Sequence, residues 1–315
     1  MNALKWIGLG CVVLLTLLLV GSYLNHRWQA PREETAYPPP GQLVAVNGHR
    51  LHVYAEGAGN PTLVFLSGSG TTAPILDFKA LYSRLSDTYR VAVVERAGYG
   101  WSDDGATPRD IETVLNETRL ALQRAKEDPP YVLFPHSISG LEALHWANRH
   151  PEEVVAIVGL DPAVPPVYAE LSPSQLRLAL VAFTARTGLL RLVPAICHGS
   201  EAVSQGHLTT NETAAYCAIL HRRTMSANML AEIDVTQTNA EQVTVQGIPD
   251  VPLYLFVSNG ADLPVNNWTG ILTAYAEAAN GRYLTLDVSH YIHNVVPDVI
   301  VDESRAFIET VMTGR

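Results

Sequence analysis

The chain has 315 residues, of which 47% are hydrophobic and 17% are charged, and its formal net charge at pH 7 is −10. This composition predicts a large folded domain with a substantial core and excludes an intrinsically disordered chain. The negative charge, without any long basic run, disfavours nucleic acid as a partner, because the surface would repel a phosphate backbone.

The first segment is apolar and long enough to cross a membrane. Residues 6–24, WIGLGCVVLLTLLLVGSYL, contain no charged side chain, and a helix of this length spans roughly 29 Å, close to the thickness of a bilayer's hydrocarbon core. A cleaved signal peptide is the competing interpretation, but its apolar core is normally shorter and is followed by a small-x-small cleavage site. We therefore expect residues 1–24 to be an uncleaved, single-pass transmembrane helix, a signal-anchor, with the large domain on the extracytoplasmic side of the membrane.

A polar segment separates this helix from the rest of the chain. Residues 25–41, NHRWQAPREETAYPPPG, end in three consecutive prolines. Consecutive prolines favour an extended conformation, so we expect a stiff linker between the membrane and a folded domain that begins at residue 42.

Beyond the linker, strand-like runs alternate with helical stretches. The central runs are continuously apolar, which is typical of parallel strands buried on both faces. The first two flank NGH, residues 47–49, as in a hairpin. The pattern predicts an α/β fold, with a mostly parallel eight-stranded sheet flanked by helices and an antiparallel start. The eight runs are residues 42–46, 50–57, 62–68, 90–96, 131–137, 154–161, 252–258 and 282–288.

The interval between the sixth and seventh runs is too long for a simple crossover. It holds about eighty residues with apolar side chains at helical spacing, where far fewer would connect two strands. We expect a helical cap, residues 165–248, inserted between two parts of the core, residues 42–164 and 249–315. Cys197 and Cys217 lie in this cap, and they could pair in an oxidising compartment or stay as buried thiols.

Residues 131–151, YVLFPHSISGLEALHWANRHP, join a buried strand to a helix and contain two candidate nucleophiles. In a strand–turn–helix nucleophile turn, the residues two before and two after the nucleophile must be small, because they approach each other closely. Ser139 would place a leucine at such a position, whereas Ser137 has Pro135 and Ser139 there. Ser137 is therefore the predicted nucleophile, and the backbone N–H of Ile138 is a candidate donor to an oxyanion.

A serine needs a base to remove its proton and a carboxylate to orient that base. His290 follows the last strand-like run, where the chain order Ser–Asp–His places the base, and His293 is the fallback. Asp262 after the seventh run and Asp161 after the sixth both lie at the carboxyl edge of the predicted sheet. We favour Asp262 because it completes the chain order, with Asp161 as the alternative acid. We expect no metal at the two histidines, because no third ligand has a suitable spacing.

The segment LSGSGTTA, residues 66–73, follows the third run at the same edge. Its glycine at position 68 lets the backbone turn toward the nucleophile, so the N–H of Ser69 is the second candidate oxyanion donor. The segment also mimics a dinucleotide-binding fingerprint, with Glu95 at the end of the next strand as the acidic residue. A dinucleotide-binding oxidoreductase is therefore one rival interpretation, although Pro74 interrupts the motif. A non-catalytic recognition module with the same fold is the other.

Taken together, these segments resemble the α/β-hydrolase superfamily over residues 42–313. RAGYGWSD is similar to that family's R-x-G-x-G-x-S segment, PHSISGLEALHWANRHP to its G-H-S-x-G-G turn and helix, and SHYIHNVVPDVI to its G-H-x-x-x-x-x-x-P ending. The chain departs from the pattern at Ser67, where a histidine is common, at Pro135, and at Ser289 before the base. The resemblance implies a cap-bearing serine hydrolase with a site made of Ser137, His290, Asp262 and the amides of Ser69 and Ile138.

The resemblance also narrows the reaction. Dehalogenases and epoxide hydrolases of this fold use an aspartate nucleophile, whereas the serine here implies acyl transfer to water. We expect hydrolysis of a carboxylic ester through an acyl-enzyme, as in a serine esterase or lipase, without a cofactor or metal. An amide or peptide substrate on the same triad is the alternative, and membrane anchoring makes lipid-like esters the first hypothesis.

Overall fold

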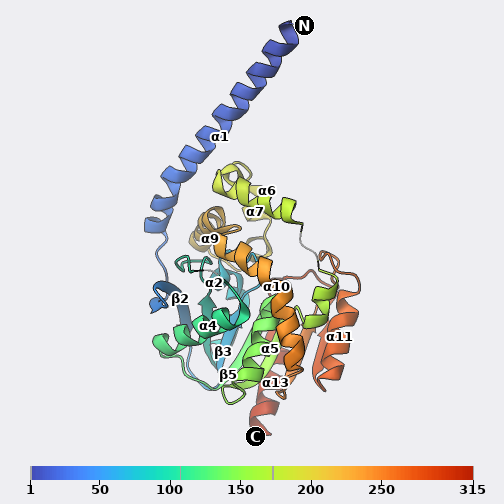
Figure 1. Cartoon of the computed structure of the whole chain (residues 1–315). Helices are drawn as coiled ribbons and strands as arrows, with labels where there is room; N and C mark the ends of the chain where they lie inside the picture. Colours follow the sequence, from blue (N-terminus) through green and yellow to red (C-terminus); the bar gives the residue numbers. More distant parts are fainter. Residues whose placement is uncertain (1, 107, 172–173, 315) are drawn as a thin grey trace.

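The computed structural model describes residues 2–106, 108–171 and 174–314 (Figure 1). The strands form one sheet in the order β1-β2-β4-β3-β5-β6-β7-β8. The β1–β2 and β2–β4 pairs are antiparallel and the remaining pairs are parallel, which confirms the predicted fold class. The strands are β1 (Gln42–Val46), β2 (His49–Glu56), β3 (Thr62–Leu66), β4 (Arg90–Glu95), β5 (Tyr131–Ser137), β6 (Val154–Pro162), β7 (Leu253–Val257) and β8 (Arg282–Thr285).

Helices cover both faces of this sheet (Figure 1). The core helices are α2 (Pro74–Asp77), α3 (Lys79–Leu85), α4 (Ile111–Ala125), α5 (Ser139–Arg149), α11 (Trp268–Ala278), α12 (Ile292–Val295) and α13 (Pro297–Thr313). On one face, Val64 and Leu66 of β3 share an apolar core with α4, α5 and α11. On the other face, Leu63 and Phe65 share a core with α3 and α13. Successive side chains enter opposite layers, which explains why β3 is a continuous apolar run.

The described residues between β6 and β7 form helices and no strand, and we call this segment the cap. Side-chain caps start several of them, including a capping box between Thr209 and Glu212. The cap helices α6 to α9 lie above the carboxyl edge of the sheet, and α10 runs down beside α5 (Figure 1). The elements are η1 (Pro165–Ala169), α6 (Gln175–Arg186), η2 (Leu189–Leu192), α7 (Ala195–His198), α8 (Glu201–Ser204), α9 (Thr210–Arg223) and α10 (Ala227–Gln246).

A disulfide joins Cys197 of α7 to Cys217 of α9 within the cap, which settles a pairing that the sequence left open. Cys11 is the remaining cysteine and is free. We expect the denatured, unreduced full-length chain to react with a thiol reagent only at Cys11, and the reduced chain to react at all three cysteines. Titration with a chromogenic disulfide before and after reduction checks this, and equal readings would mean that the bond does not form.

The first helix is longer than predicted. Helix α1 runs from Asn2 to Ala36, so residues 25–36 are helical instead of extended, and only residues 37–41 connect the helix to β1. Contacts with the cap stabilise this extension, because the Glu33 carboxylate accepts from both Nη atoms of Arg191 on η2, over 2.5 and 2.9 Å. These contacts outweigh the helix-breaking tendency of Pro31, which lies inside α1.

By length and composition, the segment Leu4–Ala36 of α1 could cross a membrane, and a signal sequence would share these properties. In Figure 1 its amino-terminal half extends away from the rest of the molecule. Only 6% of its most apolar window is buried inside the protein. This helix therefore is not a core helix of a soluble domain.

Candidate active site

Ser137 stands in the tight turn between β5 and α5. Its φ of 55° lies in the left-handed region, which a residue other than glycine adopts rarely and mainly where the surroundings enforce it. The next strand holds the turn, because the N–H of Ala163 donates to the Ser137 carbonyl over 2.7 Å. The Ser137 side chain is half-buried and borders a cavity of about 920 Å³. A nucleophile needs this combination of fixed position and access.

Ser139, the other candidate serine, holds the turn together. It is buried, and its hydroxyl lies 2.7 Å from the carbonyl oxygen of Leu66 and 2.8 Å from that of His136. It also accepts the N–H of His136 over 3.0 Å. Pro135, where a glycine was expected, pairs in register with Leu66 without ending β5. Of the two serines, the structure brings Ser137 to the cavity and engages Ser139 in backbone hydrogen bonds.

His290 lies beside the end of β5. Its ring contacts that of His136 in a tilted arrangement, at a centroid distance of 4.6 Å and an interplanar angle of 38°, and its backbone carbonyl lies 3.2 Å from the Nε2 atom of His136. Burial lowers the pKa of His136 well below its ordinary value, and the neighbouring His290 and His293 lower it further. His136 is therefore neutral, so it adds no positive charge against the ring of His290.

The two candidate carboxylates take different places around His290. Asp161 lies with its Oδ2 atom 2.6 Å from the ring Nδ1 of His290. Asp262 is exposed and lies 3.2 Å from the backbone N–H of His290. The structure therefore corrects the preference based on chain order, because the alternative acid contacts the imidazole and the favoured acid contacts the main chain. A carboxylate at Nδ1 holds the proton on that nitrogen and leaves Nε2 free to accept one.

Asp161 is held by two donors that the sequence did not reveal. Its Oδ1 atom accepts the backbone N–H of Ser258 and the indole N–H of Trp268, each over 2.8 Å. The residue is fully buried, and its φ of 52° places it in the left-handed region. Hydrogen bonds from neutral donors stabilise the ionised carboxylate in this buried position. No pattern in the sequence identifies these donors, because Ser258 directly follows β7 and Trp268 begins α11, both far from Asp161 in the chain.

The loop after β3 packs directly against the nucleophile turn. A Cβ atom on Gly68 would lie 3.0 Å from the Cβ of Ser137 and 2.8 Å from the ring of His136, so only glycine fits there. Ser69 and Ile138 both border the cavity beside Ser137. Within the described chain, the backbone N–H groups of these two residues have no hydrogen-bond acceptor. Two free N–H groups beside the candidate nucleophile are what an oxyanion hole requires.

His293, the fallback base, belongs to a separate contact. Its Nε2 atom lies 2.7 Å from Oδ2 of Asp77, and the side chain of Asn294 donates to the other carboxylate oxygen over 3.3 Å. His293 and Asp77 are buried and do not border the large cavity. Their contact joins α12 to α2, and we assign it a structural role.

Glu95 is the acidic residue of the rival dinucleotide fingerprint, and both of its carboxylate oxygens have hydrogen-bond partners within the protein. Its carboxylate accepts the backbone N–H groups of Trp101 over 2.7 Å and Ile75 over 3.3 Å. It also lies 3.0 Å from Nδ1 of His52. A buried carboxylate with these partners has no free oxygen to bind the ribose of a dinucleotide. The geometry therefore gives the dinucleotide interpretation no support.

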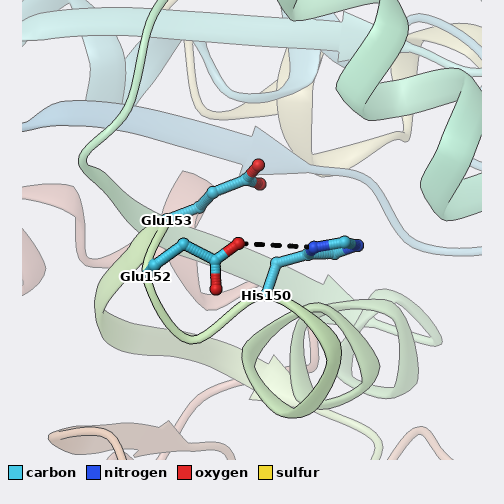
Figure 2. Close-up of side chains that lie close together, drawn as sticks. All are labelled: His150, Glu152 and Glu153. Carbon is cyan, nitrogen blue, oxygen red and sulfur yellow. Dashed lines mark ion pairs between the residues drawn. The ribbon is translucent and has the colours of Figure 1, made fainter.

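One group of possible metal ligands lies elsewhere, at the amino end of β6 (Figure 2). It consists of His150, Glu152 and Glu153. The Glu153 carboxylate already accepts from Arg119 and from the indole N–H of Trp146. Glu152 is exposed and lies 3.5 Å from the His150 ring. These contacts account for the cluster as ion pairs at the edge of the sheet opposite Ser137.

Comparisons with known proteins agree with this fold. A family model of the alpha/beta hydrolase fold matches residues 61–187. The uncharacterized protein YbdG of Bacillus subtilis (strain 168) is 33% identical over 319 residues, covering 98% of this chain and 98% of its own.

Two solved structures show the same architecture. Cfl2 from Burkholderia cenocepacia has a TM-score of 0.64 at 20% sequence identity, covering 84% of this chain and 94% of its own. The enol-lactonase from Burkholderia xenovorans LB400 has a TM-score of 0.58 at 20% identity, covering 85% of this chain and 100% of its own. At such identities these structures establish the fold and leave the substrate open.

Proposed function

The chain belongs to the α/β-hydrolase fold family, and from this premise we propose that it hydrolyses carboxylic esters through an acyl-enzyme formed on Ser137. The observation that carries the proposal is the strained Ser137 turn facing the cavity, with a His290–Asp161 pair beside it. A serine in this position favours acyl transfer to water. The enol-lactonase of the same fold gives further support, because a lactone is a cyclic ester.

In the proposed reaction, Nε2 of His290 accepts the proton of the Ser137 hydroxyl while its oxygen attacks the ester carbonyl. The N–H groups of Ser69 and Ile138 stabilise the resulting oxyanion, each contributing about 3–4 kcal/mol. His290 then donates its proton to the leaving alcohol. In the second half, His290 takes a proton from water as the water attacks the acyl carbon. The bond from that carbon to the Ser137 oxygen then breaks, His290 returns the proton to this oxygen, and the acid product leaves. Asp161 keeps His290 in the required tautomer and stabilises its charged form.

We also propose that α1 anchors the protein in a membrane, with the catalytic domain on the extracytoplasmic side. The apolar length of α1 supports the anchor. The Cys197–Cys217 disulfide supports the assignment of side, because reducing cytosol disfavours such bonds. Anchored in this way, the enzyme would meet esters that dissolve in or lie on the bilayer.

A fluorophosphonate probe tests the nucleophile. We expect the full-length protein to be labelled and Ser137→Ala to lose labelling completely, because the probe reacts only with an activated hydroxyl. Ser139→Ala is the matched control: it keeps the Ser137 hydroxyl and loses backbone hydrogen bonds of the turn, so it should still be labelled, although more slowly than the wild type. Equal labelling of wild type and Ser137→Ala, or none of either, would reject the serine-hydrolase proposal.

A chain-length series of p-nitrophenyl esters then separates the candidate substrates. We expect turnover that rises with acyl length until the chain fills the cavity of about 920 Å³ beside Ser137. Probe labelling without turnover of any ester would favour an amide or peptide substrate. Neither labelling nor turnover would favour a non-catalytic recognition module.

A further inference from the structure

Helix α6 of the cap exposes an apolar stripe to its surroundings. Leu176, Leu180 and Phe183 are 71%, 56% and 49% exposed, and their spacing places them on one side of the helix. On the opposite side, Ala182 and Ala185 are buried against the cap. The helix is therefore apolar on both sides, which is unexpected for a cap helix in contact with water.

The stripe continues into the segment that follows α6. We use the term outer cap face for the exposed apolar side chains of α6, of η2, of the residue after η2 and of α7, which are Leu176, Leu180, Phe183, Leu192, Val193 and Ile196. Soluble monomers seldom gather many large exposed apolar side chains in one region unless that region binds a partner.

The position of α1 indicates what covers this face. The turn at Gly188, directly after α6, packs against α1 so closely that a Cβ there would lie 2.5 Å from Cβ of His26 and 2.9 Å from the carbonyl oxygen of Ser22. Arg191 donates to the His26 ring over 3.0 Å. Ser22 lies in the last turn of the apolar run 6–24. The outer cap face therefore lies at the depth where that run would leave the hydrocarbon core, at the end of the molecule from which α1 projects (Figure 1).

The charges on α6 fit the same environment. The helix contains no acidic residue, although the whole chain carries a formal charge of −10. Arg177 and Arg186 are exposed and, in the described part of the chain, form no ion pair. Arginines beside an apolar stripe can contact anionic lipid headgroups while the stripe enters the boundary with the acyl chains.

We propose that the outer cap face lies in the interfacial layer of the same bilayer that α1 spans, so that the cap is a second membrane contact. This inference rests on the proposed anchor and extends the proposed ester hydrolysis. Gln175 and Arg177 of α6 also border the cavity that contains Ser137. One helix thus separates lipid from the cavity, and the substrate class is an ester whose chain partitions into the bilayer.

Lipid quenching of single labels on the full-length protein tests the inference. In a Cys11→Ser background, Leu180→Cys or Phe183→Cys carries a nitrobenzoxadiazole label, with Val245→Cys as the control. Val245 is also an exposed apolar residue, 88% exposed, but lies at the far end of α10. The protein is reconstituted into phosphatidylcholine–phosphatidylglycerol vesicles with and without brominated acyl chains. We expect at least about twofold quenching at the two cap positions and none at the control.

The possible outcomes distinguish a failure of the cap contact from a failure of the proposed membrane anchor or of the proposed ester hydrolysis. Extraction of the protein by alkaline carbonate would reject the anchor and the cap contact together. A protein that resists extraction but has unquenched cap labels would overturn the cap contact alone. Energy transfer between labelled copies without lipid quenching would assign the face to a second copy of the chain and would also overturn it. Fluorophosphonate labelling of the same variants reports separately on the proposed hydrolysis.

Discussion

Replacing Asp161 with asparagine should lower kcat for a soluble ester by about 10⁴-fold. The Asp161 carboxylate lies 2.6 Å from Nδ1 of His290 and holds the proton on that nitrogen. An asparagine can keep its bonds to Ser258 and Trp268 through its carbonyl oxygen, so its NH₂ group would face His290. A donor in that place favours the tautomer with the proton on Nε2, which cannot accept the proton of Ser137. Steady-state kinetics of the full-length variant measure the loss.

Asp262→Asn is the matched control, because it changes the other candidate acid in the same way. Its carboxylate only accepts the backbone N–H of His290, over 3.2 Å, and an asparagine carbonyl can do the same. We expect a loss of no more than about tenfold. Melting temperatures of both variants show whether either loss reflects unfolding. A large loss in Asp262→Asn together with a small one in Asp161→Asn would restore the order that chain position predicted.

Asp161 and Asp262 show which part of the candidate site could not be predicted from the sequence. The predicted nucleophile rests on steric rules that apply within five residues, and the structure has a tight turn at Ser137, with a φ of 55°, at the position that those rules selected. The two acids both follow parallel strands and therefore reach the same edge of the sheet. The choice between them depends on Ser258 and Trp268, which are distant in sequence. A local pattern cannot contain that information.

The predicted linker, residues 25–41, is a second case in which contacts distant in sequence determine the local structure. Three prolines and many polar residues predicted an extended segment over 25–41, but helix α1 continues to Ala36. The local preference of these residues for an extended conformation is overridden by ion pairs with the cap. Glu33 pairs with Arg191, and Glu34 pairs with Arg222. Tertiary contacts of this kind routinely override intrinsic helix propensity. Only residues 37–41 lie between the end of this helix and β1.

A buried ionic cluster below the site has a large expected effect on stability. Arg96 lies 3.2 Å from Glu232 of α10 and 3.6 Å from Glu142 of α5, and all three side chains are at most 6% exposed. Its Nη1 atom also donates to the carbonyl of Ser67 over 2.8 Å. Ser67 directly precedes Gly68, whose backbone packs against Ser137. One guanidinium therefore joins the cap, helix α5 and the loop that carries a candidate oxyanion donor.

Arg96→Leu should destabilise the protein by about 3–5 kcal/mol, because it leaves the buried Glu142 carboxylate without its ion-pair partner and leaves Glu232 only the Arg109 guanidinium, 3.8 Å away. Burial already raises the pKa of Glu142 above its ordinary value, although Arg96 opposes that shift. Without the arginine this pKa rises further. An acid with a raised folded-state pKa favours the folded state at low pH and loses that contribution as pH increases. The stability deficit of the variant should therefore be smaller at pH 5 than at pH 8, as measured by chemical denaturation.

Arg84→Leu is the surface control for this charge. Arg84 donates to Asp298 over 2.8 Å, and the Asp298 side chain is 82% exposed. Water stabilises both partners of such a pair, so its loss should cost less than about 1 kcal/mol and should depend little on pH in this range. If Arg96→Leu cost no more than this control, the buried cluster would not hold the cap and the loop at Ser67 in place. The site would then depend on local packing around Gly68 alone, and kcat should be unchanged in Arg96→Leu.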